Sequence, residues 1–394
     1  MRVLHVIPAV APRYGGPSHA IVQMCAALRD RGTECLVVTT DADGRSRLPV
    51  QLERPVTYRG MPTLFFRRQW SESFKYSRPL ARWLATGVTR FDVVHIHAVF
   101  SHACLAAGRA CRQGAVPYVV RPLGTLDPWS LGQKPVRKRI LWHWRAREVL
   151  RRAAAIQYTT AEERRRVERS LGLERGVVIP LGVDDELLIG RVEPGRFRGR
   201  YPELAGRPYA LVLGRLHPKK GLELLLEAFL EITRSHELAH WRLVMAGDGD
   251  TAYVARLRRL IERREGANRI LCVGWLDGVG KAAALGEAAL LVLSSRQENL
   301  GLAALEALAC GVPVLVSAAV NLAPEIQSAG AGWVTGLQHG ALTTTLIAAL
   351  QSEQERARRG AAGRELVTHR FRWSSIAAEL DALYRAVSAR ALVA

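Results

Sequence analysis

The sequence of 394 residues has no run of 18 or more apolar residues, so we expect no membrane-spanning helix. Polar residues follow Met1 too early for a secretory signal, which leads us to expect a cytoplasmic protein. Six cysteines are present without a C-x-x-C pair or a spacing typical of zinc sites, and we predict that they are reduced, buried and without a function. Hydrophobic residues form 48% of the chain and charged residues 23%, a composition that excludes disordered and collagen-like proteins.

Acidic residues are scarce in the first half of the chain. Residues 1–183 contain 30 basic and 13 acidic side chains, a net charge of +17, whereas residues 184–394 contain 26 and 23, a net charge of +3. Arginine enrichment that came only from base composition would be spread evenly. The one-sided charge therefore favours an anionic partner for the first half, such as nucleic acid, lipid headgroups or phosphates.

Short apolar segments alternate with segments of helical periodicity in both halves. The predicted strands are residues 3–8, 35–40, 92–97, 117–121, 155–158, 177–180, 209–214, 241–246, 270–273, 289–293 and 313–316. Such alternation is typical of parallel sheets with helices on both faces, so we predict an α/β protein with two doubly wound domains.

The composition also suggests where these domains begin and end. We place them at residues 1–183 and 209–372, with a Gly-, Pro- and Arg-rich linker at 184–208 and a C-terminal helix at 373–394 that packs back toward the first domain. Because ligands of doubly wound sheets bind at the carboxyl ends of the strands, we expect the site in the cleft between the two domains.

The strongest local signal is residues 294–306, a polar loop between a buried strand and a helix beginning near Leu300. The N–H groups at a helix N-terminus bind anions, and Gly301 permits a close approach to the backbone. Glu298 lies in the loop and Glu306 in the helix, so their carboxylates could reach different ends of one extended ligand and accept bonds from sugar or ribose hydroxyls. In the alternative interpretation, Glu298 caps the helix and Glu306 is solvated.

Two further loops carry candidate phosphate-binding residues. Arg215 follows one predicted strand and Lys220 precedes the next helix, so both cations should meet at the carboxyl edge of the sheet, an arrangement suited to a diphosphate. The spacing is not that of a Walker loop. In the first half, Gly15 and Gly16 follow the first strand and allow close approach of a phosphate or sugar, although a plain tight turn explains them equally well.

Together with residues 92–97 and 309–314, these motifs occur in an order that resembles the retaining GT-B glycosyltransferases of family 4. The resemblance covers residues 1 to about 336 and implies two Rossmann-like domains that face each other across a cleft. It implies that the second domain binds a nucleotide-sugar donor, UDP- or GDP-linked, and the first an acceptor. The catalytic residues that it implies are Arg215 and Lys220 on the donor diphosphate and Glu298 on the transferred sugar.

By the same resemblance, Glu306 contacts the ribose hydroxyls, and the backbone N–H groups of the helix terminus meet the β-phosphate. The other donor-binding residues are Gly15, Gly16, Asn299, Leu300 and Gly301. The developing charge on the diphosphate would be stabilised by fixed donors, and the anomeric configuration would be retained without a covalent glycosyl-enzyme.

The loop after the predicted strand at 117–121 departs from the family pattern. Many relatives have Pro-His-Gly where this chain has Pro122, Leu123 and Gly124, and the Leu123 side chain cannot form hydrogen bonds. The candidates that remain on the acceptor side are His97, Arg121 and Asp127, with His102 as a neighbour.

Two Asp-x-Asp sequences, residues 41–43 and 248–250, match the metal motif of the other large glycosyltransferase fold. Both follow strands in Gly- and Asp-rich turns, where Asp commonly bonds to the local backbone. Because the Arg215–Lys220 pair makes a metal unnecessary, we predict an enzyme without a metal or other cofactor.

Cations and aromatic residues are interleaved in residues 129–145 and in residues 65–70, as in segments that lie at a bilayer interface. We predict peripheral binding to the inner, anionic face of the plasma membrane, and an acceptor that is a lipid-linked saccharide of exopolysaccharide, O-antigen or lipopolysaccharide synthesis. The predicted membrane contacts are Trp129, Arg137, Lys138, Arg139 and Trp142. In the alternative interpretation, Trp142 packs in the core of an amphipathic helix.

Three other functions compete with this one. The same fold could transfer sugar to a soluble acceptor, as sucrose and trehalose synthases do, or interconvert nucleotide sugars as an epimerase. A basic nucleic-acid-binding protein would explain the charge of the first half. However, the chain has no helix-turn-helix, zinc-finger or RNP motif, so we predict no nucleic-acid partner.

Overall fold

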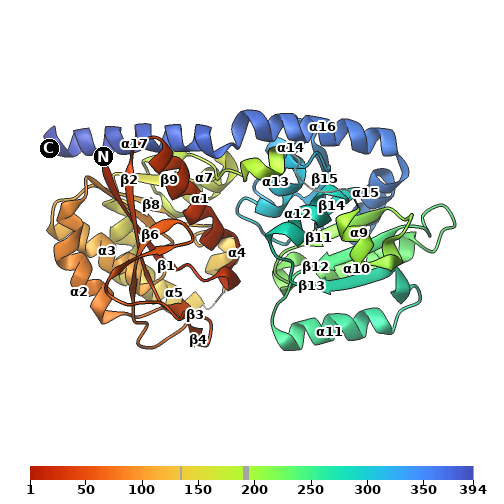
Figure 1. The fold of residues 1–394 in the computed structure, drawn as a ribbon, viewed down its shortest axis with the longest axis horizontal. Helices are drawn as coiled ribbons and strands as arrows, with labels where there is room; N and C mark the ends of the chain where they lie inside the picture. The colour runs from red at the N-terminus through yellow and green to blue at the C-terminus, as the bar shows by residue number, and fades with distance from the viewer. Residues whose placement is uncertain (134, 190–194, 394) are drawn as a thin grey trace. The chain divides into compact units, whose positions relative to one another are not determined.

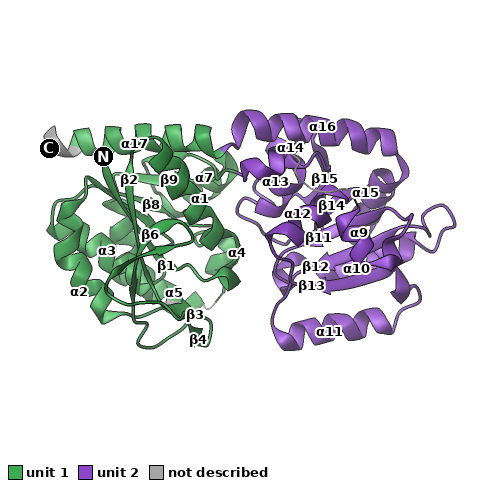
Figure 2. Ribbon diagram, viewed as in Figure 1, with its two compact units in different colours: residues 1–182, 373–394 green, residues 183–372 purple. Residues whose placement is uncertain are grey.

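The structure is a computed structural model that describes residues 1–133, 135–189 and 195–393 (Figure 1). The chain forms two compact units, which Figure 2 colours separately. Unit 1 comprises Met1–Gly182 and Trp373–Ala394, and unit 2 comprises Val183–Arg372.

Unit 1 is built on an eight-stranded sheet with the strand order β10-β9-β8-β7-β1-β2-β6-β5. Every neighbouring pair is parallel except β5 and β6, which form an antiparallel hairpin at one edge. The strands are β1 (Arg2–Ala9), β2 (Glu34–Thr40), β5 (Pro55–Tyr58), β6 (Met61–Phe66), β7 (Val93–His97), β8 (Tyr118–Arg121), β9 (Ala155–Tyr158) and β10 (Gly176–Val178). A separate two-stranded ribbon consists of β3 (Ala42–Asp43) and β4 (Ser46–Arg47).

Helices cover both faces of this sheet. They are α1 (Gly16–Asp30), α2 (Arg78–Gly87), α3 (His102–Gln113), α4 (Pro128–Leu131), α5 (Pro135–Leu141), α6 (Arg147–Arg151), α7 (Ala161–Leu171) and α17 (Trp373–Val393). Leu4 and Val6 of β1 join an apolar core with α2 and α3. Alternate residues of a strand point to opposite faces, so His5 lies on the face that α1 and α17 cover.

Unit 2 has a six-stranded, entirely parallel sheet with the order β13-β12-β11-β14-β15-β16. Its strands are β11 (Tyr209–Leu213), β12 (Arg242–Ala246), β13 (Ile270–Gly274), β14 (Leu290–Leu293), β15 (Val314–Ser317) and β16 (Gly332–Thr335). The central strands are nearly continuous apolar runs because helices cover both of their faces.

The helices of unit 2 follow its strands in the βαβ pattern. They are α8 (Asp185–Ile189), α9 (Arg196–Arg200), α10 (Leu222–Ile232), α11 (Thr251–Glu262), α12 (Gly278–Gly286), α13 (Leu302–Ala309), α14 (Ala323–Ser328), α15 (His339–Gln351) and α16 (Glu353–Arg370). The segment predicted as a linker, residues 184–208, thus contains α8 and α9, while its residues 190–194 lie outside the described part of the chain. In unit 1, α17 packs against α1, and the Thr33 hydroxyl donates to Asp381 at 3.0 Å.

Two of the predictions from sequence are wrong in detail. The helix expected near residues 135–153 is divided by a π-helical turn at Trp142–Ala146. The cysteines are not all buried: Cys272 is exposed, because it lies on the edge strand β13, and Cys310 is half-buried. Within the described part of the chain, no helix combines the length and apolar character needed to cross a bilayer.

Candidate functional site

Three glycines bring the ends of β11, β12 and β13 close together. The N–H of Gly214 donates to Ala246 O at 2.9 Å, and the N–H of Gly247 donates to Gly274 O at 2.7 Å. A Cβ atom on Gly247 would lie 1.9 Å from the Gly214 oxygen, so no larger residue fits there. These glycines therefore allow a ligand to approach the backbone closely at the carboxyl edge of the unit 2 sheet.

The loop after β11 carries the two predicted cations. Arg215 is exposed and Lys220 half-buried, and both line a small pocket at the ends of β11 and β14 with Ser294. Gly221 caps α10 with a φ of +64°, and a Cβ there would lie 2.3 Å from the Ser294 oxygen. The structure thus brings Arg215 and Lys220 to the same edge, against the loop that follows β14.

That second loop is joined to the first by a salt bridge. Lys220 Nζ lies 2.7 Å from Glu298 Oε1, and the Arg296 N–H donates to the Lys219 oxygen at 2.7 Å. The Ser294 hydroxyl also donates to the Lys220 oxygen at 3.0 Å. The alternative in which Glu298 merely caps the helix is wrong, because its carboxylate pairs with Lys220 instead.

The charge state of Glu298 follows from this pairing. Burial acts to raise the pKa of its carboxyl group, but the charges of Lys220 and Lys219 and two hydrogen bonds outweigh burial. One of these bonds comes from the Ser295 hydroxyl at 3.3 Å. The net result is a pKa below the usual value of glutamate, so Glu298 is an ionised acceptor at neutral pH.

The N-terminus of α13 is open toward the same loop. Gly301 is its N-cap residue, with a φ of +78°, and a Cβ there would lie 3.2 Å from Leu293 Cδ2. This turn places the backbone N–H groups of Leu300 and Gly301 at the positive end of the helix. Asn299 precedes them in the same turn, and their contact with a phosphate stays a prediction.

Glu306 lies within α13 and is not solvated. Its Oε1 atom accepts a hydrogen bond from Lys281 Nζ of α12 at 2.9 Å, and its side chain is only 13% exposed. Lys281 was not predicted from the sequence, because nothing in the spacing of the motifs indicates that α12 packs beside α13. Lys281 fixes one carboxylate oxygen of Glu306 and leaves the second for another donor.

In unit 1, Gly15 and Gly16 occupy the turn between β1 and α1. Gly15 has φ and ψ of 71° and −137°, a region that essentially only glycine enters, and it is the N-cap of α1. The preceding Tyr14 holds the turn, since its hydroxyl donates to Glu72 Oε1 at 2.6 Å. The conformation explains Gly15 as a turn, and the contact with a donor stays a prediction.

The residues predicted on the acceptor side lie in the interior of unit 1. His97 and Arg121 are 0% exposed and Asp127 is 4% exposed. His97 Nε2 lies 3.1 Å from His5 Nδ1, and the Asp127 carboxylate caps α4 by accepting the Trp129 N–H at 3.0 Å. None of the three side chains reaches the surface, so the structure does not support direct contact of these side chains with an acceptor.

Backbone strain marks the loops above these buried residues. Ala98, directly after β7, has a φ of +84°, and Leu123, after β8, has a φ of +57°. The two loops are joined because the Ala98 N–H donates to the Arg121 oxygen at 2.8 Å. Positive φ does not single out these two loops, because six other non-glycine residues have it as well, and the acceptor site stays a prediction.

The predicted membrane segment exposes different apolar residues from those expected. Trp142 is partly buried and packs against the apolar core of unit 1. In contrast, Val136, Ile140 and Trp144, spaced four residues apart, are 72%, 61% and 65% exposed. Trp129 is half-buried and Arg139 is exposed. The side chain of Arg137 lies outside the described part of the structure.

Lys138 is partly held by the protein itself. Its ammonium group donates to the Ser130 oxygen and lies 5.7 Å from the centre of the Phe100 ring. The second segment, residues 65–70, is divided: Phe65 and Phe66 of β6 and Arg68 are buried, whereas Arg67, Gln69 and Trp70 are exposed, Trp70 by 61%. The strand β6 was not predicted here, and a membrane contact of the exposed residues stays a prediction.

Only the second Asp-x-Asp sequence bonds locally: Asp248 Oδ1 accepts the Gly249 N–H at 2.7 Å, and Asp250 caps α11. In the first, Asp41 Oδ1 accepts the N–H of Arg68, 27 residues further along the chain, at 2.7 Å.

Comparison with known proteins decides what the two halves are. Residues 14–187 match the family described as Glycosyltransferase Family 4, and residues 196–366 match Glycosyl transferases group 1. The chain belongs to glycosyltransferase family 4. Its two Rossmann-like sheets are those of the GT-B fold.

Full-length relatives of this glycosyltransferase include a phosphatidyl-myo-inositol mannosyltransferase of Mycobacterium leprae, 28% identical over 98% of this chain and 97% of the relative. A GDP-mannose:cellobiosyl-diphosphopolyprenol α-mannosyltransferase of Komagataeibacter xylinus is 25% identical over 100% and 95%. The fold is similar to sucrose-phosphate synthase from Thermosynechococcus elongatus, with a TM-score of 0.78 at 21% identity over 99% of each chain. It is equally similar to Anabaena HepE in complex with UDP and glucose, with a TM-score of 0.78 at 20% identity over 98% and 100%.

These findings identify a nucleotide-sugar glycosyltransferase. In this glycosyltransferase the ion pairs Lys220–Glu298 and Lys281–Glu306 both lie in the half that matches Glycosyl transferases group 1. The strained loops at Ala98 and Leu123 lie in the half that matches Glycosyltransferase Family 4.

Proposed function

We propose that this glycosyltransferase moves a hexose from a UDP- or GDP-linked sugar to a lipid-linked saccharide, with retention of the anomeric configuration and without a metal. The observation that carries the donor part of the proposal is the Lys220–Glu298 pair beside Arg215 and the N-terminus of α13. This arrangement places two cations, an ionised carboxylate and the positive end of a helix dipole at one edge of the sheet. A sugar diphosphate needs such partners for its phosphates and its hydroxyls.

The chemistry follows from the charges at this edge. As the sugar–phosphate bond breaks, negative charge grows on the diphosphate, where Arg215, Lys220 and the N–H groups of the α13 terminus are fixed to receive it. Glu298 accepts hydrogen bonds from hydroxyls of the departing sugar, because Lys220 keeps its carboxyl group ionised. The acceptor hydroxyl then attacks from the face that the leaving group occupied, and its proton passes to an oxygen of the departing diphosphate, so no carboxylate nucleophile is needed.

Glu306 is the proposed ribose ligand. Lys281 holds one of its oxygens at 2.9 Å and so orients the carboxylate. The free oxygen can accept from ribose hydroxyls.

A lipid-linked acceptor is supported by the surface of α5 and the following π-helical turn. Val136, Ile140 and Trp144 present apolar surface next to Arg139, an arrangement suited to the interface of an anionic membrane. The Mycobacterium leprae and Komagataeibacter relatives are named for a phosphatidylinositol and a diphosphopolyprenol acceptor, which adds weight to such a substrate here.

The test of the donor part combines binding and turnover. Thermal shifts with UDP, GDP, ADP and CDP identify the base, because a ligand bound to the folded state raises its stability. The double variant Arg215→Ala/Lys220→Ala is expected to lose both the shift and sugar transfer. Intact nucleotide affinity and transfer in this variant would overturn the proposal, and product anomers resolved by NMR test retention.

A further inference from the structure

One face of the unit 1 sheet carries a layer of polar side chains where apolar ones are usual. Register places Cys35 of β2, His5 of β1, His95 and His97 of β7 and Arg121 of β8 on the same face. Each is at most 6% exposed. Cys25 of α1 and Tyr384 of α17 cover them, and Tyr384 Oη lies 2.7 Å from His95 Nδ1.

Many polar atoms of this layer have no protein partner. Among the described residues, none forms a hydrogen bond with His5 Nε2, His95 Nε2 or His97 Nδ1, and the three guanidinium nitrogens of Arg121 are also unpaired. A buried polar group without a partner costs about 1–3 kcal/mol. A layer with so many of them is expected to bind something that is not part of the chain.

Three ligand atoms in this layer meet the distances of a metal site. A ring nitrogen of His5 and the Sγ atoms of Cys25 and Cys35 all lie within 4.8 Å of one another. Zinc binds thiolate sulfur at about 2.3 Å and histidine nitrogen at about 2.0 Å, so ligands around one ion lie closer together than that limit. We propose that Cys25, Cys35 and His5, through Nε2, bind one zinc ion that joins α1 to β1 and β2.

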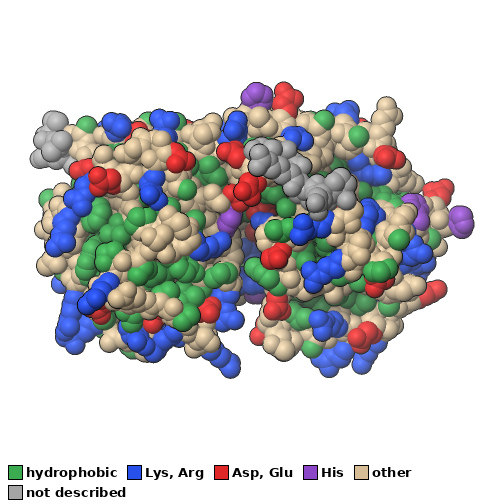
Figure 3. All heavy atoms as spheres, viewed as in Figure 1, with side chains coloured by type: hydrophobic (Ala, Val, Ile, Leu, Met, Phe, Trp, Pro, Cys, Tyr) green, Lys and Arg blue, Asp and Glu red, His purple; other side chains and the backbone are tan. Residues whose placement is uncertain are grey.

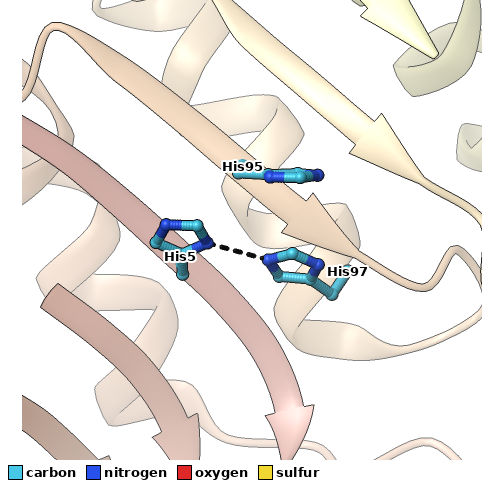
Figure 4. Close-up of side chains that lie close together, drawn as sticks. All are labelled: His5, His95 and His97. Carbon is cyan, nitrogen blue, oxygen red and sulfur yellow. Dashed lines mark hydrogen bonds between the residues drawn. The ribbon is translucent and has the colours of Figure 1, made fainter. Parts of the chain in front are cut away.

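The environment of His5 is suited to a zinc ligand. Its Nδ1 atom is engaged by His97 Nε2 at 3.1 Å, and Figure 4 shows the other ring nitrogen on the side of the ring that faces away from His97. Histidines that bind metals characteristically use their second nitrogen in such a hydrogen bond, which fixes the tautomer and the ring orientation. His97 is then a positioning residue for His5.

The two thiols are buried and come from different elements, Cys25 from α1 and Cys35 from β2. Thiolate and imidazole ligands together favour zinc over magnesium or calcium.

The three histidines are a second group within the same distance limit, and their charge disfavours it. The rings of His95 and His97 are tilted by 36° to each other, with centroids 4.1 Å apart, and Figure 4 shows the three rings side by side. A zinc ion with three neutral ligands would keep its full charge beside the buried Arg121. Two thiolates neutralise the ion and avoid this repulsion.

This zinc ion is structural and separate from the sugar-transfer reaction. α1 begins at the Gly15 turn and packs against β2 and α17, so the ion fixes the helix that follows that turn. The three protein ligands leave one position of the zinc tetrahedron for a further ligand.

The proposal is tested on the full-length chain purified with a reductant and without chelators. Elemental analysis is expected to find one zinc per chain. After removal of the metal and titration with cobalt, thiolate-to-metal charge transfer and visible bands of tetrahedral Co²⁺ are expected. A wild-type protein with neither the zinc nor the cobalt bands would overturn the proposal, whatever happens to the variants.

Variants locate the site. Cys25→Ser and Cys35→Ser are expected to lose the zinc and the charge-transfer band, and His97→Asn to bind zinc about 10–100-fold more weakly. Cys111→Ser is the matched control, because Cys111 is a buried cysteine that belongs to the apolar core with α2 and α3. Retention of the zinc in the double variant Cys25→Ser/Cys35→Ser would contradict the assignment, as would its loss in Cys111→Ser alone.

Discussion

At the scale of single residues, Lys220 connects the two loops of the proposed donor site in unit 2. It pairs with Glu298 at 2.7 Å, while its backbone oxygen accepts from Ser294 at 3.0 Å. Both side chains of the pair are less than 20% exposed, so the salt bridge is only partly screened by solvent. The pair therefore fixes the position of the cation before any ligand binds, which is the condition for effective stabilisation of a developing charge.

Replacement of Lys220 by alanine tests this role. We expect kcat/KM for sugar transfer to fall by about 100-fold or more, because one fixed donor to the leaving diphosphate is lost. The free energy of unfolding should also fall by about 1–3 kcal/mol, because the Glu298 carboxylate stays buried but no longer has a partner. Steady-state kinetics and thermal unfolding measure the two effects. Arg259→Ala, which removes an exposed cation from α11, is the control and should change neither.

Glu298 makes a separate prediction about pH. Its pKa in the folded state lies below the value in the unfolded chain, so the unfolded state binds the proton more tightly. The stabilisation from this group is complete above the unfolded pKa of about 4.3 and is lost as the pH falls below it. Denaturant unfolding between neutral and acidic pH should show a smaller loss of stability in Glu298→Gln than in the wild type. An identical pH dependence in both proteins would refute the assignment of an ionised, paired Glu298.

At the scale of elements, α5 and the π-helical turn after it form a surface with apolar and basic residues. The double variant Ile140→Glu/Trp144→Glu removes the two apolar side chains closest to the turn and adds negative charge. It should abolish flotation with anionic vesicles, because apolar burial and attraction to the headgroups both decrease. Val279→Glu is the control, since Val279 is 54% exposed on unit 2 and should leave binding unchanged. Wild-type protein that stays unbound at low salt would defeat the membrane proposal.

The sequence predicts those elements whose own pattern is strong. β9 and α7 were predicted with their observed bounds, and both sheets follow the predicted alternation of strands and helices. The hairpin of β5 and β6 was missed, because Pro62 interrupts the strand and basic residues surround it. α12 was missed as well, since a short helix with three glycines has little helical propensity.

The candidate site was predictable where its residues follow strands. Arg215, Lys220 and Glu298 end up together because the ends of parallel strands share one edge of the sheet. The partner Lys281 and the burial of His97 and Arg121 were not predictable, because they depend on which helix lies against which face. Which apolar residues are exposed, here Ile140 and Trp144, likewise depends on the phase of a helix interrupted by a π-helical turn.

At the scale of the whole molecule, charge and donor chemistry are divided between the halves of the chain. Residues 1–183 carry a net charge of +17, and Lys and Arg side chains line the lower left edge of unit 1 in Figure 3. The paired carboxylates and cations of the proposed donor site lie instead in unit 2, in a half with a net charge of only +3. The excess of positive charge is therefore not needed for the donor and is available for an anionic surface or acceptor.

This division predicts where a nucleotide protects the chain. Hydrogen exchange with the nucleotide that gives the largest thermal shift should slow in residues 214–221 and 294–306, because these loops of unit 2 supply the cations and the helix terminus. In Lys220→Ala the nucleotide should no longer slow hydrogen exchange in these loops. In Arg259→Ala it should slow exchange as much as in the wild type. The edge strand β13, which carries the exposed Cys272, is an internal reference, and its hydrogen exchange should not change when the nucleotide is added. Protection confined to unit 1 would contradict the placement of the donor, since unit 1 lacks the Arg215–Lys220 pair, and it would transfer the donor role to the turn at Gly15 and Gly16.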